Sequence, residues 1–383
     1  MLEGKNVVLG VTGSISAYKA CDIVSRLRKA GASVNVIMTE NAKKFVSPIT
    51  FEALSSNAVV DDTFDRSRPE VVEHIALAKK ADVILVAPAS ADIIGKISAG
   101  IADDMLTSTI VAATCPIVIC PAMNTHMYTN RIVSDNMAML RDYGFLFVEP
   151  DSGRLACGDT GKGKLRAPEE IVEYIENLLL STSELKGKRV LITTGGTSEQ
   201  IDRVRCITNH STGKMGMALA REVVRRGGLV TLVVGNVTER VPVGVDKVVS
   251  VRSTEDMYHA VMDNMEDADY IIKSAAPSDY RVANYSDAKI KSDTLTLELV
   301  KNVDIAAAVG ANKGNRKLVI FSAETDNLIE HAKAKLVKKN ADLVVANNVT
   351  EKGAGFGVDT NIVSIITRDM RVLKQLICRD LQN

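Results

Sequence analysis

Near its N-terminus the chain reads VVLGVTGSISAYK, from Val7 to Lys19. An apolar strand, a turn of small residues and the start of a helix follow one another in this stretch. Backbone N–H groups and hydroxyls at such a turn can bind a phosphate, although a structural tight turn has the same spacing. The stretch is not a GxGxxG fingerprint, because only Gly10 and Gly13 are present and position 15 is Ile. It therefore favours one phosphate-sized anion over a dinucleotide.

The same alternation of strand and helix continues through the first half of the chain. Continuous apolar runs separated by amphipathic segments are typical of a parallel sheet that is covered on both faces. We predict strands at 7–11, 33–38, 83–87, 117–120 and 146–148, and helices at 17–29, 71–80, 102–113, 132–143 and 168–180. The first half is therefore predicted to be an α/β domain with a Rossmann-like parallel sheet.

A short polar stretch at 181–186 ends this pattern, and the second half repeats it. We predict strands at 188–194, 229–234, 270–274, 318–321 and 343–346, an edge strand at 362–367, and helices at 215–226, 254–265 and 328–339. The polar, β-prone segment 279–299 indicates an excursion or flap. Because 383 residues exceed what one core usually organises, we predict two Rossmann-like domains, 1–186 and 187–383.

Composition excludes several classes of protein. Lys+Arg and Asp+Glu number 47 each, and a net charge of zero argues against general binding to nucleic acid or an anionic membrane. No secretory signal is recognisable, and no apolar run approaches the roughly 20 residues that span a bilayer, so we expect a cytoplasmic protein. The 6 cysteines form no CxxC pair, which suits neither a disulfide framework nor a zinc site.

Three polar segments of the first half are candidates for a site. PASAD at 88–92 and PAMN at 121–124 each follow a buried strand, where the ligand loops of parallel sheets lie. ACGDTGKG at 156–163 places one thiol, Cys157, in a glycine-rich loop typical of a mobile lid. Taken singly, His74 on a helix, Cys157 and Met123 have simpler readings as structural or packing residues.

Together with the opening turn and His74, these segments resemble the flavin-containing cysteine decarboxylase family, most closely its phosphopantothenoylcysteine decarboxylase branch. The resemblance covers residues 4–180 and depends mainly on PxMN at 121–124 and ACGD at 156–159. It implies a flavodoxin-like flavin domain in which FMN oxidises a cysteinyl group to a thioaldehyde, carbon dioxide leaves, and the electrons return to the product. Ser90 and Asp92 stand where the family often has Thr and Asn.

The resemblance also assigns roles to residues. His74 would act near the flavin in the oxidative half-reaction, since imidazole exchanges protons near neutral pH. Asn124 would bind the substrate carboxylate with Met123 packed nearby, and Cys157 would donate a proton in the final reduction. The FMN-binding residues would be Gly13, Ser14, Ser16, Thr39 and Ser90.

A second strand and turn open the other half of the chain. TGGT at 194–197 follows a strand, and TNHSTGKMG at 208–216 leads into a helix. The second motif is not a Walker A loop, because Thr208 occupies its first glycine position and Met215 replaces the Ser/Thr that binds magnesium. A helix start rich in N–H, hydroxyl and Lys groups still suits a phosphate.

Two lysine pairs are further candidates for phosphate binding. Lys335 and Lys339 lie four residues apart on one face of a predicted helix. Lys289 and Lys291 share one face of a strand or flap, by the period of two. Solvated charges are the simpler reading, and an anion held between the lysines is the alternative.

The second half resembles the phosphopantothenate–cysteine ligase family over residues 187–380, through STGKMG, AAPSDYR, KIK, KNVDI and FSAET. In bacterial members CTP, accompanied by Mg²⁺, activates the phosphopantothenate carboxylate as an acyl cytidylate, which the cysteine amine then attacks. Gly196, Ser198 and Pro277 replace a usual Pro, Arg and Val, and Lys273 adds a charge.

By this resemblance, Arg205 and Asn209 would hold the phosphopantothenate, and Lys289 would stabilise charge during the attack of cysteine. The resemblance identifies no metal-ligating residue. The CTP-binding residues would be Lys273, Ser274, Ala275, Asp279, Lys289, Asn302, Val303, Asp304, Ile305, Phe321, Lys335 and Lys339.

The leading hypothesis is thus a bifunctional enzyme with a ligase domain and an FMN-dependent decarboxylase domain, acting in coenzyme A biosynthesis on 4'-phosphopantothenate, cysteine and CTP. The resemblance implies self-association, with decarboxylase trimers assembled into a dodecamer and ligase dimers. Two alternatives remain at this point. One is an NAD(P)-dependent oxidoreductase, which the imperfect glycine fingerprint disfavours. The other is a non-catalytic flavin-binding regulatory protein on the same fold.

Overall fold

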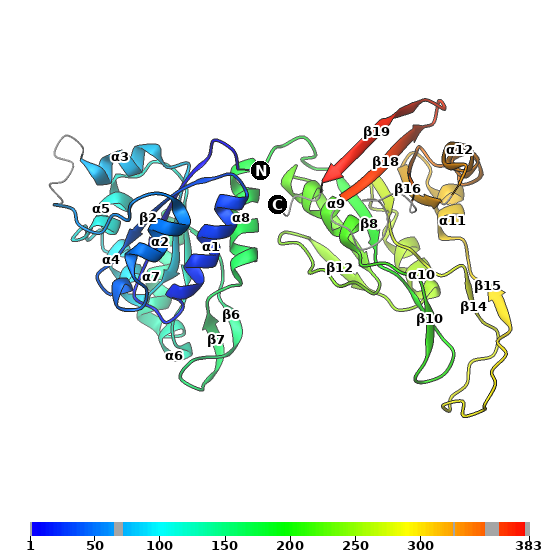
Figure 1. Cartoon of the computed structure of the whole chain (residues 1–383), viewed down its shortest axis with the longest axis horizontal. Coiled ribbons are helices and arrows are strands. Elements are labelled where there is room, and N and C mark those ends of the chain that lie inside the picture. Colours follow the sequence, from blue (N-terminus) through cyan, green and yellow to red (C-terminus); the bar gives the residue numbers. More distant parts are fainter. Residues whose placement is uncertain (1, 65–71, 325, 349–359, 380–383) are drawn as a thin grey trace. The chain divides into compact units, whose positions relative to one another are not determined.

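The computed structural model describes residues 2–64, 72–324, 326–348 and 360–379, and these divide into two units (Figure 1). One unit comprises the chain up to Leu180, and the second begins at Ser181. Each has its own sheet and its own core. The predicted boundary at 186/187 stays a prediction. In the described residues, no helix is both long and apolar enough to cross a membrane.

The N-terminal unit is built on a parallel sheet of order β2-β1-β3-β4-β5, the strand order of flavodoxin-like folds. Its strands are β1 Asn6–Val11, β2 Ser33–Met38, β3 Val83–Ala89, β4 Ile117–Pro121 and β5 Leu146–Phe147. The helices are α1 Ala17–Lys29, α2 Pro48–Ser55, α3 Glu73–Lys80, α4 Ala91–Ser98, α5 Met105–Ala112, α6 Thr125–Tyr128, α7 Arg131–Asp142 and α8 Pro168–Leu180, with a 3-10 turn at Ala42–Lys44.

Alternate side chains of these strands enter separate hydrophobic clusters, as the period of two requires. Val7 and Leu9 pack in one cluster with residues of α1, α2 and α8, whereas Val8 and Ile84 pack in another with residues of α4, α5 and α7. The strands are therefore apolar throughout because both faces of the sheet are covered.

Several elements of this unit differ from the sequence-based expectation. Helices α2 and α4 were not predicted. Helix α4 begins within the PASAD segment, which was interpreted as a ligand loop. The glycine-rich loop predicted at 156–163 is instead the tip and returning strand of a hairpin, β6 Asp151–Arg154 and β7 Thr160–Lys164. The start predicted for α3 at residue 71 lies outside the described residues.

The C-terminal unit has a sheet of order β12-β11-β8-β13-β16-β17-β18-β19. Its strands are β8 Arg189–Thr194, β11 Leu229–Val234, β12 Lys247–Ser250, β13 Tyr270–Lys273, β16 Lys317–Glu324, β17 Leu343–Asn348, β18 Thr360–Thr367 and β19 Val372–Arg379. The helices are α9 Lys214–Arg225, α10 Thr254–Asn264, α11 Ile305–Asn312 and α12 Leu328–Lys338. The strands from β12 to β17 run parallel, and β18 and β19 are antiparallel.

The strand predicted at 362–367 is present as β18, but its predicted edge position was wrong, because β19 pairs with β18 and takes the edge. The C-terminal sequence that forms β19 has only a weak alternation of its own. Helix α11 and strand β12 were also not predicted.

Two small antiparallel pairs stand apart from the main sheet. Strands β9 Ser198–Gln200 and β10 Cys206–Thr208 form one pair, and β14 Tyr280–Val282 and β15 Leu299–Lys301 form the other. The predicted excursion at 279–299 is confirmed, and Figure 1 shows it as an arm extending from the unit beyond β14 and β15.

Candidate active sites

The opening turn of the N-terminal unit is joined to the loop after β3. The buried Thr12 donates its hydroxyl proton to the Pro88 carbonyl at 2.7 Å and accepts from the Ser90 amide at 3.0 Å. Gly10 and Gly13 are needed for close packing, since a Cβ on Gly13 would lie 2.5 Å from Asn41 Cβ. The predicted FMN-binding residues therefore meet at the carboxyl edge of the sheet, where ligands of such folds bind.

The hydroxyls of this edge differ in what they already bind. Ser90 caps α4 by accepting from the Ile93 amide at 3.3 Å, and Thr39 accepts from the Ala42 amide at 3.3 Å. Ser16 is the N-cap of α1 but makes no side-chain capping bond, and the Ser14 hydroxyl accepts from the Ser16 amide. An uncapped start of a long helix beside two hydroxyls fits one phosphate group, such as that of a flavin mononucleotide.

Asn124 connects the PxMN segment to the hairpin that carries Cys157. Its amide nitrogen donates to Cys157 Sγ at 3.1 Å and to Asp159 Oδ2 at 2.9 Å. Its amide oxygen accepts from the His126 amide at 2.8 Å, which caps α6 and fixes the orientation of the side chain. The hydrogen bond from Asn124, with a second from Cys157, holds the pKa of Asp159 below its usual value. Asn124 therefore directs N–H donors, which suit a carboxylate, towards the thiol.

The backbone of the hairpin lies directly against the PxMN segment. Met123 donates its amide proton to the Gly163 carbonyl at 3.0 Å, and its side chain packs against the core. A Cβ on Gly163 would lie 2.3 Å from the Met123 carbonyl oxygen, so only glycine allows this approach.

A charged cluster that sequence reasoning missed anchors the same hairpin. Glu149 accepts from Tyr128 Oη at 2.6 Å, Lys162 Nζ at 2.8 Å and Arg141 Nη2 at 2.5 Å. Partial burial raises the pKa of Glu149, but the hydrogen bonds from Lys162 and Tyr128 outweigh it and lower that pKa to about 2. Residues from α6, α7 and β7 carry the three donors, so no single sequence motif contains the cluster.

His74 lies half-buried at the second position of α3. None of the hydrogen bonds between described residues joins it to Asn124 or Cys157. The structure of one chain thus brings Asn124, Met123 and Cys157 together through direct contacts, and it places His74 on a separate element.

In the C-terminal unit, the ends of β8 and β13 are joined through Thr193. Ser274 Oγ donates to the Thr193 carbonyl at 2.8 Å, and the Ala275 amide donates to Thr193 Oγ1 at 3.3 Å. The TGGT turn continues this contact, because the Ala276 amide donates to the Gly195 carbonyl at 2.9 Å. A Cβ on Gly216, in the first turn of α9, would lie 2.3 Å from Thr194 Oγ1. The two motifs of this half therefore pack together at the carboxyl edge of the sheet.

Lys273 ends β13 with only 7% of its surface exposed. Burial, and then the nearby charge of Lys339, lower its pKa to about 7. Among the described residues, no hydrogen bond or ion pair involves the side-chain amine of Lys273, whose backbone pairs within the sheet.

The loop after β13 is held by two asparagines. Asn302 donates its backbone amide to the Asp279 carbonyl at 2.8 Å and its side-chain amide to the Ser278 carbonyl at 2.9 Å. Asn209 donates to the Pro277 carbonyl at 3.0 Å. Asp279 itself is exposed, so its carboxylate remains accessible to a ligand.

Each lysine predicted on one helix face has its own acidic partner. Lys335 donates to Glu324 Oε1 at 2.6 Å and to Ser322 Oγ at 2.9 Å, and Lys339, just beyond α12, pairs with Asp304. Asp304 also caps α11, and Ile305 is buried beneath it, whereas Val303 is exposed and Phe321 half-buried. A phosphate at this face would have to compete with these carboxylates.

Arg205 anchors the excursion to the domain. Its guanidinium donates to the buried carboxylate of Asp202 at 2.6 and 3.0 Å and to the Ile290 carbonyl at 2.6 Å. The pairing holds the pKa of Asp202 well below its usual range. Lys289, adjacent to this anchor, is exposed, and with Lys291 it lies outside strands β14 and β15.

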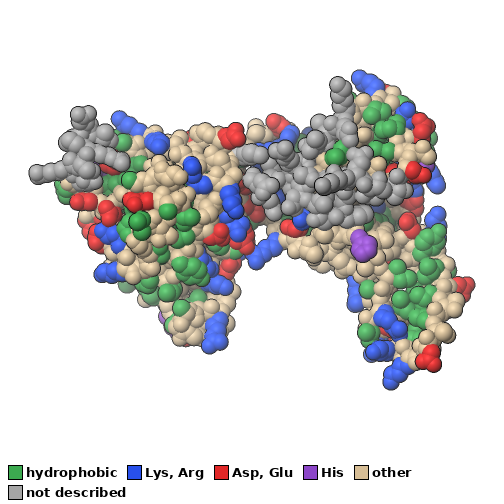
Figure 2. Space-filling model, in the orientation of Figure 1, with side chains coloured by type: hydrophobic (Ala, Val, Ile, Leu, Met, Phe, Trp, Pro, Cys, Tyr) green, Lys and Arg blue, Asp and Glu red, His purple; other side chains and the backbone are tan. Residues whose placement is uncertain are grey.

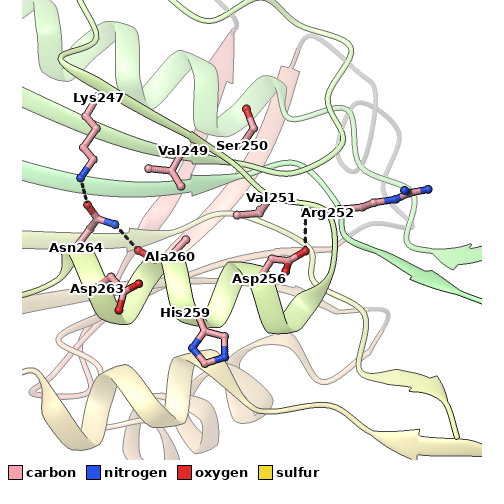
Figure 3. A pocket seen from close by; sticks show the side chains of 10 residues that line it. All are labelled: Lys247, Val249, Ser250, Val251, Arg252, Asp256, His259, Ala260, Asp263 and Asn264. Atoms are coloured by element: carbon pink, nitrogen blue, oxygen red, sulfur yellow. Dashed lines mark hydrogen bonds between the residues drawn. The ribbon is translucent and has the colours of Figure 1, made fainter.

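A groove of about 820 Å³ lies between β12 and α10 (Figure 3). Its lining includes Lys247, Arg252 and His259 together with the acidic Asp256 and Asp263. None of the predicted ligand-binding residues lines it. Among the described residues, no group of three or more His, Cys, Asp or Glu side chains could hold a metal ion.

The structure is built from two α/β domains, one with the flavodoxin-like strand order, and the family comparisons identify it as a flavoprotein. The model of the family described as Flavoprotein matches residues 1–180. The model of the DNA/pantothenate metabolism flavoprotein C-terminal domain matches residues 185–378.

Close relatives match along almost the whole chain. The coenzyme A biosynthesis bifunctional protein CoaBC of Bacillus subtilis (strain 168) is 48% identical over 373 residues, covering 96% of this chain and 92% of that protein. Its counterpart in Vibrio cholerae serotype O1 is 43% identical over 373 residues, covering 96% and 93%. A crystal structure of the C-terminal domain of a CoaBC protein is 38% identical with a TM-score of 0.44, covering 51% of this chain and 88% of that one. The chain belongs to the family of coenzyme A biosynthesis bifunctional proteins, which confirms the resemblance found in the sequence.

Proposed function

We propose that the chain catalyses two consecutive steps of coenzyme A biosynthesis, with a ligase in its C-terminal unit and a decarboxylase in its N-terminal unit. The ligase joins 4'-phosphopantothenate to cysteine, and the decarboxylase converts the product to 4'-phosphopantetheine. Membership of the family over 96% of the chain supports both activities. The observation that best supports the decarboxylase activity is the hydrogen bond of 3.1 Å from the Asn124 side-chain amide to Cys157 Sγ, beside the opening turn that is predicted to bind FMN.

In the decarboxylase half, FMN would be held by Gly13, Ser14, Ser16, Thr39 and Ser90. When bound, this flavin supplies the reversible uptake of an electron pair from the cysteinyl group. The uncapped start of α1, with the hydroxyls of Ser14 and Ser16, suits its phosphate.

Asn124 would bind the substrate carboxylate through the N–H groups that now contact Asp159 and Cys157. A carboxylate at this position replaces one anionic acceptor by another, so the orientation of Asn124 need not change. Cys157, exposed at the tip of the hairpin, would then donate a proton to the product. His74 would exchange the proton of the oxidative half-reaction.

In the ligase half, the phosphopantothenate carboxylate attacks the α-phosphorus of CTP and pyrophosphate leaves. The amine of cysteine then attacks the acyl carbon, and CMP leaves with the electron pair of the broken C–O bond. Mg²⁺ would accompany the triphosphate and neutralise part of its charge. The exposed Lys289 would stabilise the charge that develops on the acyl group, and Asn209, with Arg205 nearby, would hold the phosphopantothenate.

The nucleotide would lie along the carboxyl edge of the sheet, against residues 273–275, Asp279 and residues 302–305. Phe321, Lys335 and Lys339 would complete its site. For the two lysines, binding means exchanging the carboxylates of Glu324 and Asp304 for phosphate oxygens.

Self-association is part of this proposal. Trimers of the decarboxylase domain, assembled into a dodecamer, would place flavin sites at subunit contacts, and the ligase domains would form dimers. Such contacts would allow His74 of one chain to complete the site of another. The mass of the particle in solution, measured by light scattering, tests the stoichiometry.

A coupled assay tests both activities. The chain is supplied with phosphopantothenate, cysteine, CTP, Mg²⁺ and FMN, while CMP, pyrophosphate and carbon dioxide are followed, with ATP as the comparison nucleotide. We expect all three products with CTP. Carbon dioxide from added phosphopantothenoylcysteine without CMP would remove the ligase from the proposal, and no product in either assay would favour the flavin-binding regulatory protein. Family membership already disfavours the NAD(P)-dependent oxidoreductase.

A further inference from the structure

Four buried residues of the C-terminal unit form a continuous line of hydrogen bonds. Thr197 ends the TGGT motif, Glu199 lies on β9, Thr254 is the first residue of α10, and Ser278 follows the predicted nucleotide segment. Their exposed fractions are 0% for Thr197, 5% for Glu199, 1% for Thr254 and 3% for Ser278. The line is therefore shielded from water, where hydrogen bonds are strongest and unpaired groups are costly.

The carboxylate of Glu199 determines which groups of this line donate hydrogen bonds and which accept them. Glu199 Oε1 accepts from the Thr254 amide at 2.9 Å and from Thr254 Oγ1 at 2.8 Å. Thr254 Oγ1 also lies 3.2 Å from the Ser278 carbonyl, but the nearer, charged oxygen is the stronger acceptor of its one proton.

The remaining protons follow from that assignment. Since the Thr254 hydroxyl donates to Glu199, its oxygen is free to accept from Thr197 Oγ1 at 2.9 Å. Thr197 Oγ1 in turn accepts from the Ser278 amide at 2.9 Å. The hydrogen bonds of the line therefore all point the same way: the Ser278 amide donates to Thr197, the Thr197 hydroxyl to Thr254, and the Thr254 hydroxyl to the Glu199 carboxylate.

This line ends at the loop that carries the predicted nucleotide ligands. Ser278 accepts from the Asn302 side chain through its carbonyl, and the adjacent Asp279 accepts from the Asn302 amide. Any shift of Ser278 would therefore displace Asp279 and Asn302 together.

The N-terminus of helix α10 has a capping box that does not involve Glu199. Ser253 already accepts from the Asp256 amide at 3.0 Å, and the Asp256 side chain accepts in return from the Ser253 amide at 2.9 Å. This is a complete capping box. Glu199 satisfies one further free N–H of α10, that of Thr254, and its second hydrogen bond, from Thr254 Oγ1, is the one that joins the helix to the line.

We propose that Glu199, Thr254 and Thr197 are positioning residues of the ligase, which hold the Ser278–Asp279 backbone and Asn302 in the geometry that binds the cytidine nucleotide. The proposal rests on the proposed function, because it takes this loop to be part of the CTP site. It gives the TGGT motif a role, as the hydroxyl of Thr197 is the link between helix α10 and the loop.

Calorimetric titration of the full chain with CTP and Mg²⁺ tests this role. Thr254→Val removes the central hydroxyl at nearly constant volume, Thr254→Ser restores it, and Thr197→Val provides a second break in the line. Ser253→Ala is the matched control, since it weakens the same end of α10 without touching the line. Melting curves of all four variants monitor folding.

We expect Thr254→Val and Thr197→Val to weaken CTP binding by about tenfold, with Thr254→Ser and Ser253→Ala close to the unchanged chain. The KM for CTP should rise in the same two variants more than kcat falls. Equal CTP affinity in Thr254→Val, Thr197→Val and Ser253→Ala would overturn the proposal. If the unchanged chain itself does not bind CTP, the proposed nucleotide site fails first, and that result is distinguishable from failure of the positioning role.

Discussion

Lys273 places an amine inside the C-terminal sheet, where burial lowers its pKa to about 7 from the ordinary value of 10.5. Between these values the unfolded chain binds more protons than the folded one, so the stability contributed by this site rises as the pH rises. Below pH 7 the amine is charged in both states, and the full cost of burying the charge is present.

Replacing this charge should therefore stabilise the chain in a pH-dependent way. We predict that Lys273→Met raises the free energy of unfolding of the C-terminal unit by about 3 kcal/mol at pH 6, and by less than half of that at pH 9. Denaturant titrations at both values measure the difference, with Lys338→Met, an exposed lysine, as the control. A gain that is equal at pH 6 and pH 9 would show that Lys273 is not a buried, shifted base.

At the scale of elements, the hairpin β6–β7 carries Cys157 at its tip and is attached at its base. Glu149 binds Lys162 of β7, and Gly163 pairs with Met123. The folded pKa of Glu149 is about 2, below its ordinary 4.5, so its contribution is complete above pH 4.5 and is lost as the pH falls towards 2. At neutral pH this attachment is intact.

We predict that Glu149→Gln and Lys162→Met release the hairpin and increase the alkylation rate of Cys157 about two- to fivefold at pH 7.5, because a partly exposed ion pair contributes up to about 1 kcal/mol. Mass spectrometry of the Cys157 peptide measures the rate. Lys164→Met, on the same strand, is the matched control and should leave it unchanged. The idea fails if Lys162→Met and Lys164→Met react alike.

On the scale of the whole molecule, each unit has its own sheet and its own hydrophobic clusters, so each should fold alone. The segment between them belongs structurally to the second unit. Thr182 donates to the Arg225 carbonyl and Leu185 to the Arg226 carbonyl, both at 2.9 Å, and Leu185 packs against the cluster beneath α9.

We predict that a fragment of residues 181–383 is more stable than one of residues 187–383 by about 2 kcal/mol, because the shorter one loses two hydrogen bonds and an apolar contact. Urea denaturation of the two fragments measures the difference. Equal midpoints would support the boundary at 186/187. The fragment of residues 1–180 should retain flavin, seen as visible absorbance after purification.

The sequence alone was sufficient for the five strands of the N-terminal sheet, for six of the eight strands of the C-terminal sheet, for the parallel α/β class and for the family. Buried strands are continuous apolar runs, and the motifs at 121–124 and 156–159 are contiguous in the chain. It did not predict α2, α4, α11 or the hairpin, because short elements depend on their neighbours more than on their own periodicity. It placed Asn124 and Cys157 in one site by resemblance, and the structure adds their direct contact.

The tertiary structure was needed to find the polar clusters whose residues lie far apart in the chain. Glu149 with its three donors, and the line from Ser278 to Glu199, each join residues from several elements without any common spacing. The same holds for the acidic partners of Lys335 and Lys339, which the helix pattern could not reveal. Local sequence indicates where buried strands and turns form, because the apolar run of a strand and the residues of a turn are contiguous in the chain. Long-range packing determines which polar side chains meet, and hence how the two predicted sites are held.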